Sequence, residues 1–171
     1  MGYISVAREH LLSLILLLVA GGGFLIAGSS GGSITQPIAF NHKKHIDNEL
    51  ECSACHSFFQ TSAHAGRPTT DTCVLCHETA LTESPEEEKI RQYAARGEQI
   101  PWRRLFKLPS HVYFSHQTHV VSGQVECKSC HGKIADSTSP PSKPEIKLTM
   151  DRCIDCHKSR RISTDCLACH K

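Results

Sequence analysis

The sequence predicts a mostly irregular fold with short α-helices, preceded by one transmembrane helix. Three observations lead to this prediction. An uncharged apolar run occupies Leu11–Gly28, near the start of the chain. Apolar residues make up 39% of the 171 residues, and many of them lie in the first 28 positions, so the remainder is poor in aliphatic side chains for a core of its size. All ten cysteines belong to five copies of one short motif, Cys-x-x-Cys-His.

Each motif combines two cysteines one helical turn apart with a histidine directly after the second. This arrangement is typical of c-type haem attachment, in which both thiols bond the porphyrin covalently and the histidine supplies an axial nitrogen to the iron. The predicted attachment cysteines are Cys52, Cys55, Cys73, Cys76, Cys127, Cys130, Cys153, Cys156, Cys166 and Cys169. The predicted proximal histidines are His56, His77, His131, His157 and His170. The sequence thus predicts a multihaem cytochrome c fold whose core is five c-type haems, and we expect no folding without them.

Two other uses of the cysteines explain less of the sequence. Pairs of Cys-x-x-Cys can close tetrahedral zinc sites, but zinc needs no histidine directly after every second cysteine. Disulfides suit an even cysteine count in an exported chain, yet they also leave the five histidines unexplained. Haem attachment accounts for every cysteine and for the histidine that follows each pair.

Residues 1–28 are predicted to anchor the chain in a membrane. The apolar run Leu11–Gly28 has 18 residues, whereas a spanning helix needs about 17–25 and the core of a signal peptide about 7–15. No clear Ala-x-Ala cleavage site follows, so a retained single-pass anchor is favoured over a removed signal. Arg8 biases the N-terminal tail to the cytoplasm, which puts the haem part on the periplasmic or outer side of the cytoplasmic membrane. Residues 29–35, which begin with the small, polar stretch Ser29–Ser33, are predicted to be a flexible tether.

An internal repeat organises the remainder of the chain. Phe40–His45 and Phe114–His119 both read Phe-x-His-x-x-His, lie 74 residues apart, and are each followed by Glu-Cys-x-x-Cys-His. Repeated sequence units usually mean repeated structure. We therefore expect a two-haem module at residues 36–83 and a three-haem module at residues 111–171. Histidines three apart lie on roughly one face of a helix, so each pair can project together and still serve two different irons.

Residues 84–110 are predicted to form a helical connector between the modules. Ser84 can cap a helix, Pro85 suits its first position, Glu87 completes a capping box and Gly97 is placed to end it. Nothing in this helix ligates metal, which favours a solvated connector.

The segment Ile100–Pro109, which follows the connector helix, is both basic and apolar. One interpretation packs Trp102 and Phe106 against the haems or the modules. The other makes the segment a docking surface for a partner subunit or for lipid headgroups, because Trp and Arg are common at interfaces.

Every six-coordinate haem needs one distal ligand besides its motif histidine. The chain offers seven candidates for five positions, namely His42, His45, His64, His111, His116, His119 and Met150. A surplus of ligands indicates that both axial positions of every iron can be filled, and a haem without an open position serves electron transfer. Methionine ligation would raise the potential of its haem, although Met150 can equally be a packing residue and single histidines can lie at the surface.

The motifs also carry a family resemblance. Phe-x-His-x-x-His followed by Cys-x-x-Cys-His resembles the small bis-histidine multihaem cytochromes of sulfate- and metal-reducing bacteria. More of the chain resembles the pentahaem cytochrome subunit of alternative complex III. The stretches that carry this likeness are Gln36–His45, His64–Pro68, Ile100–Trp102, Leu108–His116 and Met150–His157.

This resemblance implies a membrane-anchored subunit that passes electrons from a quinol-oxidising membrane complex to a soluble electron carrier. The expected partners are therefore other subunits of that complex, the soluble carrier and the membrane. It further implies that His42 and His116 cap the haems of their own following motifs. By the same likeness, His119 reaches the haem of Cys166–His170 and Met150 that of Cys153–His157.

An electron-transfer protein is the function that these features predict. The alternative is a multihaem reductase of the nitrite or sulfite type, which needs one open haem; carbon monoxide binding would distinguish the two. A haem-based sensor or structural subunit is the third possibility, but no signalling domain is recognisable. Nucleic-acid binding finds no support, because the net charge is only +2 and the basic residues are scattered.

Overall fold

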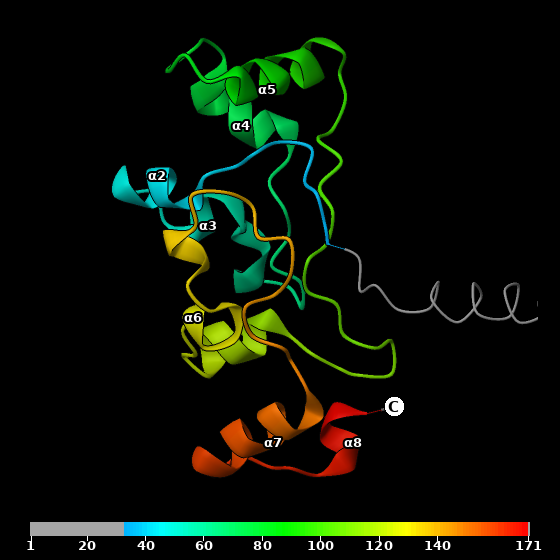
Figure 1. Cartoon of the computed structure of the whole chain (residues 1–171). Helices are drawn as coiled ribbons and strands as arrows, with labels where there is room; N and C mark the ends of the chain where they lie inside the picture. Colours follow the sequence, from blue (N-terminus) through cyan, green and yellow to red (C-terminus); the bar gives the residue numbers. More distant parts are fainter. Residues whose placement is uncertain (1–32, 171) are drawn as a thin grey trace, which may run out of the picture. The chain divides into compact units, whose positions relative to one another are not determined.

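Short helices joined by long irregular segments make up residues 33–170, the part of the chain that the computed structural model describes (Figure 1). The α-helices are α2 (His42–Asp47), α3 (Cys52–Cys55), α4 (Thr70–His77), α5 (Pro85–Ala95), α6 (Lys128–His131), α7 (Met150–Ser159) and α8 (Cys166–Cys169). Two 3₁₀ turns, η1 (Ser57–Gln60) and η3 (Ile134–Asp136), and one π-helical segment, η2 (Gln117–Ser122), complete the elements. An isolated antiparallel bridge joins Val112 to His170.

Side-chain caps fix where several of these helices begin. Asn41 accepts a hydrogen bond from the backbone of Lys44 at the start of α2, and Thr69 accepts one from Thr72 at the start of α4. Thr149 and Asp165 cap α7 and α8 in the same way. Each cap contributes about 1 kcal/mol, which matters for helices as short as four residues because these are not stable alone.

The hydrophobic core of the described residues is very small. Only Ile38, Ile90 and Ile100 are buried hydrophobic residues there. Cys73, Val74, Tyr93 and Trp102 pack against them while remaining partly exposed. Large apolar side chains elsewhere stay at the surface, Leu75 with 83% and Leu167 with 82% of their area exposed. The protein part of the fold therefore buries little apolar surface by itself.

Helix α5 begins and ends close to the predicted positions. Ser84 caps it, Pro85 occupies its first turn, and Gly97 follows it with φ +64. The predicted capping box is absent, because the Glu87 carboxylate accepts hydrogen bonds from Leu81 and Thr82 instead of closing back on Ser84. Glu87 and Ile90 are buried where α5 packs on α4, so a solvated connector is an incomplete description of this helix.

The transmembrane part of the predicted fold class has to be corrected. No helix within residues 33–170 combines the length and the apolar character that crossing a membrane requires. The apolar run Leu11–Gly28, to which that prediction referred, lies outside the described residues, as do most of residues 29–35. The described fold is that of a small protein of short helices and irregular segments.

The helices succeed one another along the unit formed by residues 34–170. Figure 1 places α4 and α5 at one end and α7 and α8 at the other, with α2, α3 and α6 between them. Helix α2 packs on η3, and η1 packs on η2, so segments from both predicted modules interlock. The division into modules at residues 36–83 and 111–171 stays a prediction.

The segment Ile100–Pro109 has no regular secondary structure, and both of its aromatic side chains pack against other residues of the unit. Trp102 contacts the isoleucine cluster and donates a hydrogen bond from Nε1 to the Pro68 carbonyl over 3.1 Å. The Phe106 ring lies 4.4 Å from the His131 ring, edge to face. The packing interpretation therefore holds for the two aromatic residues, whereas Arg103, Arg104 and Lys107 remain exposed.

Candidate functional site

Every Cys-x-x-Cys pair sits on one short turn of helix, which places its two sulfur atoms on neighbouring positions of the same face. Helices α3, α4, α6, α7 and α8 carry the five pairs. All ten cysteines have free thiols, so no disulfide consumes them. Six are exposed and four are partly exposed, as groups that bond to a cofactor must be before attachment. The cysteines are therefore available for thioether formation.

The internal repeat of the sequence is also a repeat of geometry. The Phe40 ring stacks on the His45 ring at 4.4 Å and meets the His42 ring edge-on at 4.7 Å. In the second copy Phe114 stacks on His119 at 4.5 Å and meets His116 edge-on at 4.8 Å. The phenylalanine thus fixes the orientation of two imidazoles at once, which explains why all three residues recur at the same spacing.

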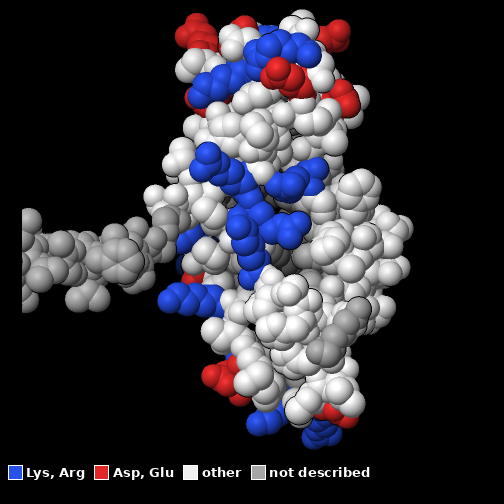
Figure 2. Space-filling model, turned by 90° about the vertical axis from the view of Figure 1, so that its right-hand side faces the viewer, with Lys and Arg blue, Asp and Glu red and all other residues white. Residues whose placement is uncertain are grey.

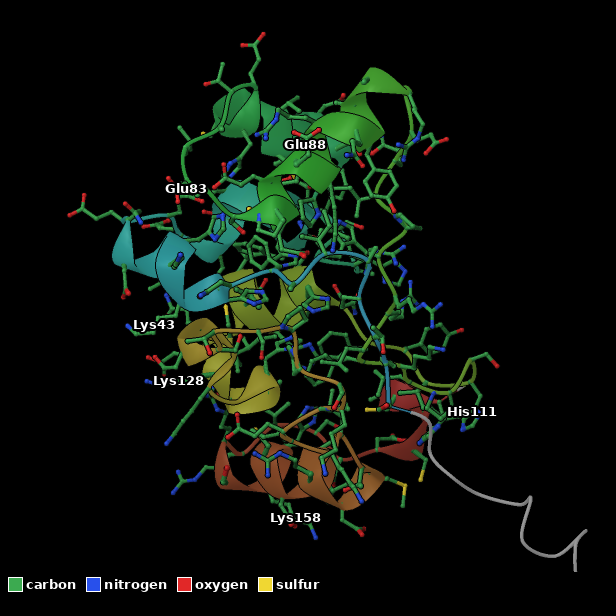
Figure 3. The ribbon with its side chains drawn as sticks, turned by 45° about the horizontal axis from the view of Figure 1, so that its top comes forward. Lys43, Glu83, Glu88, His111, Lys128 and Lys158 are labelled. Atoms are coloured by element: carbon green, nitrogen blue, oxygen red, sulfur yellow. The ribbon has the colours of Figure 1, made fainter. Side chains whose placement is uncertain are left out.

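Four of the five motif histidines face a second imidazole across a short gap. The ring centroids are 6.2 Å apart for His45 and His77, and 6.3 Å apart for His116 and His131. They are 6.1 Å apart for His119 and His157, and 5.5 Å apart for His111 and His170. Figure 3 labels His111, which lies next to the C-terminal helix α8.

The fifth motif histidine, His56, lies near His42. The pKa of His42 is lowered to about 4, mainly by burial and to a smaller extent by the neighbouring positive charges of His56 and His45. Burial likewise lowers the pKa of His131, with smaller contributions from His116 and His56. Buried imidazoles that repel one another as cations are held neutral, which is the state in which imidazole ligates iron.

These spacings fit two imidazoles bound to opposite sides of one metal ion. With metal–nitrogen bonds of about 2 Å on each side, the two ring centroids would be about 6 Å apart. The observed distances of 5.5 to 6.3 Å agree with that requirement. Each facing pair can therefore hold one haem iron between its rings.

Hydrogen bonds also set the tautomers that metal binding requires. The Nδ1 atoms of His56 and His157 lie 2.9 Å from the carbonyl oxygens of Gly66 and Ser163. Those of His45, His116 and His119 lie 2.8, 2.9 and 2.8 Å from other backbone carbonyls. A carbonyl oxygen only accepts, so Nδ1 must carry the proton and donate it. The lone pair on Nε2 is then free for iron.

Gly66 has a particular role in holding His56. Its φ of +80 lies in the left-handed region, and a Cβ at this position would be 2.5 Å from the Phe58 ring. Glycine is the residue that tolerates both conditions. The backbone conformation in turn directs the Gly66 carbonyl at His56, so this loop orients a predicted proximal ligand.

Two of the seven distal candidates face no motif histidine. His64 is exposed, and its ring faces no other imidazole among the described residues. Met150 is 63% exposed at the first position of α7. In the structure His119 lies against His157. The family resemblance implied instead that Met150 is the distal ligand at the motif of His157, and that His119 is the distal ligand at the last motif, which ends in His170. The structure instead pairs that last motif with His111, which sequence reasoning left without a partner.

Close thiols show which motifs are neighbours. Burial and, to a smaller extent, the Cys55 thiol raise the pKa of Cys73 to about 11, which places the motif on α4 near the motif on α3. Burial and then Cys52 raise the pKa of Cys127, which joins the motifs on α3 and α6.

The same evidence extends the series towards the C-terminus. After burial, Cys156 and Cys153 raise the pKa of Cys130, which places the motif of α7 beside that of α6. After burial, Cys169 raises the pKa of Cys153, which places α8 next. The spatial order of the motif helices is therefore α4, α3, α6, α7, α8, which differs from their order in the sequence.

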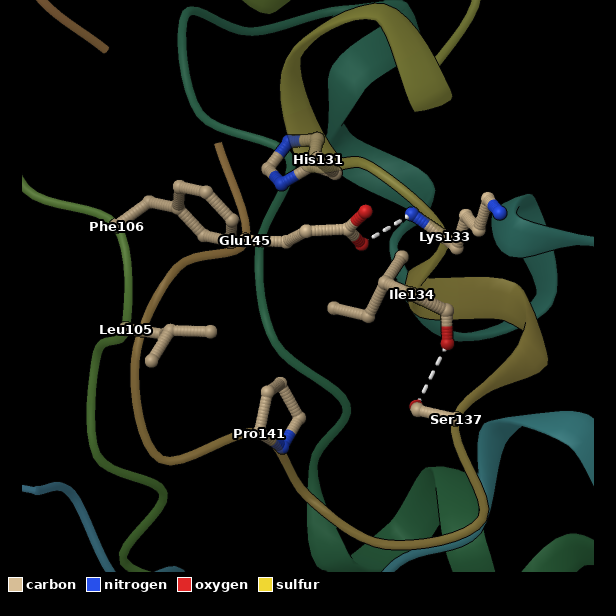
Figure 4. A pocket seen from close by; sticks show the side chains of 8 residues that line it. All are labelled: Leu105, Phe106, His131, Lys133, Ile134, Ser137, Pro141 and Glu145. Carbon is tan, nitrogen blue, oxygen red and sulfur yellow. Dashed lines mark hydrogen bonds between the residues drawn. The ribbon is translucent and has the colours of Figure 1, made fainter. Parts of the chain in front are cut away.

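A small cavity of about 70 Å³ adjoins the central motif. His131 and Phe106 line it together with Ile134 and Pro141 (Figure 4). The Glu145 carboxylate also borders this cavity and accepts a hydrogen bond from the Lys133 backbone over 2.7 Å. Apolar walls beside an imidazole face suit the edge of a porphyrin.

A tetrahedral zinc site is not assembled by these residues. Nowhere in residues 33–170 do three or more His, Cys, Asp or Glu side chains converge as they would around a bound metal ion. Imidazoles facing one another across about 6 Å, with paired thiols beside them, instead define a protein that binds haem covalently. The class is that of c-type cytochromes with several haems.

Comparisons with known proteins agree with this class. Residues 112–171 match the family model described as cytochrome c7 and related cytochrome c, and residues 27–100 match that of the class III cytochrome c family. The chain is 34% identical over 161 residues to the menaquinone reductase, multiheme cytochrome c subunit, of Nitratidesulfovibrio vulgaris strain Hildenborough, with 80% of this chain and 77% of that protein covered. The chain belongs to the multihaem c-type cytochromes and is an electron-transfer protein.

Proposed function

We propose that the chain carries five c-type haems, each held between two histidines, and that it conducts electrons along this series. The observation that carries the proposal is that four of the five motif histidines face a second imidazole at 5.5 to 6.3 Å, while the fifth, His56, lies near His42. When bound, haem supplies a one-electron couple. The chain supplies the thiols, the paired imidazoles and the spacing that keeps neighbouring sites close. The proposed axial pairs are His42 with His56, His45 with His77, His116 with His131, His119 with His157 and His111 with His170.

The proposed partners are the other subunits of a quinone-reactive membrane complex and a soluble electron carrier. The relative named above is a subunit of a menaquinone reductase. That name favours electrons passing from the carrier towards the quinone, which is opposite to the direction implied by the resemblance to alternative complex III. We propose this direction, with the haem part on the outer side of the cytoplasmic membrane. Protease accessibility in spheroplasts tests the location, and menaquinone reduction by the purified complex tests the direction.

Distal ligation predicts how variants respond to carbon monoxide. The reduced wild-type protein is expected to show no spectral change, because no iron has an open position. Replacing His45 with alanine should open one iron, so about one fifth of the haem should bind carbon monoxide. Replacing His64 with alanine is the matched control and should leave the spectrum unchanged, since His64 is exposed and unpaired. Pyridine haemochrome analysis should give five haems per chain throughout.

The reductase alternative makes the opposite prediction for the same measurement. A carbon monoxide shift in one fifth of the wild-type haem would mean an open iron, and nitrite or sulfite reduction would then be the function to assay. A response of the His64 variant alone would instead mean that the proposed distal assignment is wrong.

A basic groove is the proposed docking surface for an acidic partner subunit. It has a volume of about 300 Å³, apolar walls that include Ile146 and Leu148, and three basic side chains, Arg104, Lys107 and Lys147. None of the three forms an ion pair with any described residue. Figure 2 shows basic side chains gathered in a band at the middle of one face. Unpaired cations around an apolar groove favour an acidic partner with apolar contacts.

Charge reversal tests this docking surface. The double variant Arg104→Glu, Lys107→Glu is expected to associate with the partner complex at least tenfold more slowly at low salt, with the difference shrinking at high salt. Lys158→Glu on α7 is the matched control, because it is exposed and outside the groove (Figure 3). Equal loss of association in the control would indicate that net charge acts, not this groove.

A further inference from the structure

One predicted proximal histidine has a carboxylate beside it. The Nδ1 atom of His77 lies 3.6 Å from Oε2 of Glu87, and the His77 and Glu87 side chains are only 17% and 9% exposed. No hydrogen-bond partner reaches His77 Nδ1 within the described residues. Buried polar atoms without a partner are rare in folded proteins and often have a functional reason. Glu87 is the group placed to accept its proton.

Glu87 is held in this position by three donors. Its Oε2 accepts hydrogen bonds from the backbone of Leu81 and Thr82 over 2.8 and 3.3 Å, and its Oε1 accepts one from the Thr82 hydroxyl over 2.5 Å. These bonds stabilise the ionised carboxylate despite its burial. Helix α5 carries Glu87 and packs on α4, which carries His77. The charge is therefore fixed relative to the histidine by two packed helices.

Six of the other paired histidines have a neutral group at Nδ1. His45, His56, His116, His119 and His157 all donate from Nδ1 to backbone carbonyls. His42 shares its Nδ1 contact with the Ser137 hydroxyl over 3.3 Å. Across residues 33–170, His77 alone has a carboxylate oxygen within 4.0 Å of a ring nitrogen. Among the described residues, the site of His77 thus differs from the rest in having a carboxylate directly against a ring nitrogen.

We propose that Glu87 is a positioning residue that lowers the reduction potential of the haem attached at Cys73 and Cys76. The proposal rests on the five-haem function given above. A carboxylate beside the imidazole N–H increases the basicity of the ligating nitrogen, which stabilises ferric over ferrous iron. The negative charge acts in the same direction, because oxidised haem carries one more positive charge than reduced haem.

The haem site on α4 lies at one end of the series, so a lowered potential there affects the direction of electron flow. The motif of α4 is the terminal member of the spatial series, and its neighbour is the motif of α3. A terminal haem with a lowered potential passes its electron readily to the next haem and accepts one back reluctantly. Glu87 therefore biases electron flow away from the α4 end of the protein.

A Glu87→Gln variant of the haem-loaded full chain tests the proposal. The glutamine oxygen can accept from the Leu81 and Thr82 backbone as Glu87 Oε2 does, and its amide can donate to the Thr82 hydroxyl, so the fold should be kept. We expect the oxidised-to-reduced equilibrium of one haem to change about tenfold, which is about 59 mV upwards for a one-electron couple. The readout is a redox titration resolved into five steps, with haemochrome quantitation beside it.

Controls separate this effect from a general change in charge. The Glu88→Gln variant removes one negative charge from the same helix. Native Glu88 pairs with Arg91 over 2.8 Å, and its side chain is 53% exposed, so its charge is not directed at His77 (Figure 3). Glu87→Asp keeps the charge and should restore most of the low potential. If Glu87→Gln loses haem, Arg91→Gln still tests the proposal, because it should shift the potential of the same haem in the opposite direction.

Arg91 provides a test with the opposite sign. Its guanidinium lies 4.0 Å from Glu87 Oε2 and offsets part of the carboxylate charge. Arg91→Gln should therefore lower the potential of the same haem, while Arg96→Gln, whose partner is the exposed Glu98, should not. Five unchanged midpoints in Glu87→Gln with five haems present would overturn the role of Glu87 and leave the electron-transfer function standing. Fewer than five haems in the wild-type protein would instead overturn the proposed function.

Discussion

A chain prepared without haem is expected to be unfolded across residues 33–170. The described part buries only three hydrophobic residues, Ile38, Ile90 and Ile100, and three of its α-helices have just four residues. Helices of that length are not stable in isolation, and burying one isoleucine contributes only about 1.5–3 kcal/mol. The apolar faces of the haems must therefore supply most of the driving force for folding.

The test compares the chain made in a host that attaches haem with the chain made in a host that does not. The haem-free chain should lose nearly all of its far-UV helical signal, and a protease should cut it at many sites. The haem-loaded chain, handled identically, should resist the protease and unfold in one cooperative transition. A haem-free chain with native helix content and cooperative unfolding would contradict the expectation, and the helices would then need another source of stability.

The haem-attachment sites and the start of helix α5 were predictable because each depends on residues a few positions apart in the sequence. Five Cys-x-x-Cys-His motifs located the attachment sites, and the caps at Ser84 and Pro85 located helix α5. The Phe-x-His-x-x-His repeat predicted two equivalent structures, and its rings do repeat within 0.1 Å. Covalent attachment, capping and stacking within a few residues depend on local spacing, which a sequence contains directly.

Tertiary pairing was not predictable in the same way. His111 and His170 are far apart in the sequence and are brought together by an irregular segment that bridges to the C-terminus at Val112. The role of Glu87 was hidden, because its position three residues after Ser84 indicated a capping box. Only the packing of α5 on α4 directs its carboxylate at His77. No periodicity or motif in a single sequence reports such contacts.

The spatial order of the motifs is a further property that the sequence conceals. The second motif of the chain lies at one end and the first lies next to it, so the chain folds back before it continues. The first motif is on α3 and the second is on α4. Sequence order alone would therefore place the first motif, not the second, at the end of the series. The electrostatic influence of Cys55 on Cys73, and that of Cys52 on Cys127, indicate the reverse order.

Removing the central site is expected to stop conduction between the two ends. The motif of α6 contacts the motif of α3 through Cys127 and Cys52, and that of α7 through Cys130 and Cys153. The double variant Cys127→Ala, Cys130→Ala should keep four haems, divided into two separate pairs that no longer exchange electrons rapidly.

The matched control removes a terminal site by Cys166→Ala, Cys169→Ala, which also leaves four haems but keeps them in one continuous series. Both variants are mixed rapidly with a substoichiometric reductant, and the redistribution of electrons among the haems is followed by absorbance. The terminal variant should equilibrate as one population, as the wild type does, whereas the central variant should show two populations that equilibrate slowly. Equal rates in the two variants would mean that electrons pass around the central site, and the single-file order of α4, α3, α6, α7 and α8 would be wrong. Because both variants lose the same number of haems, a difference between them can arise only from the position of the missing site.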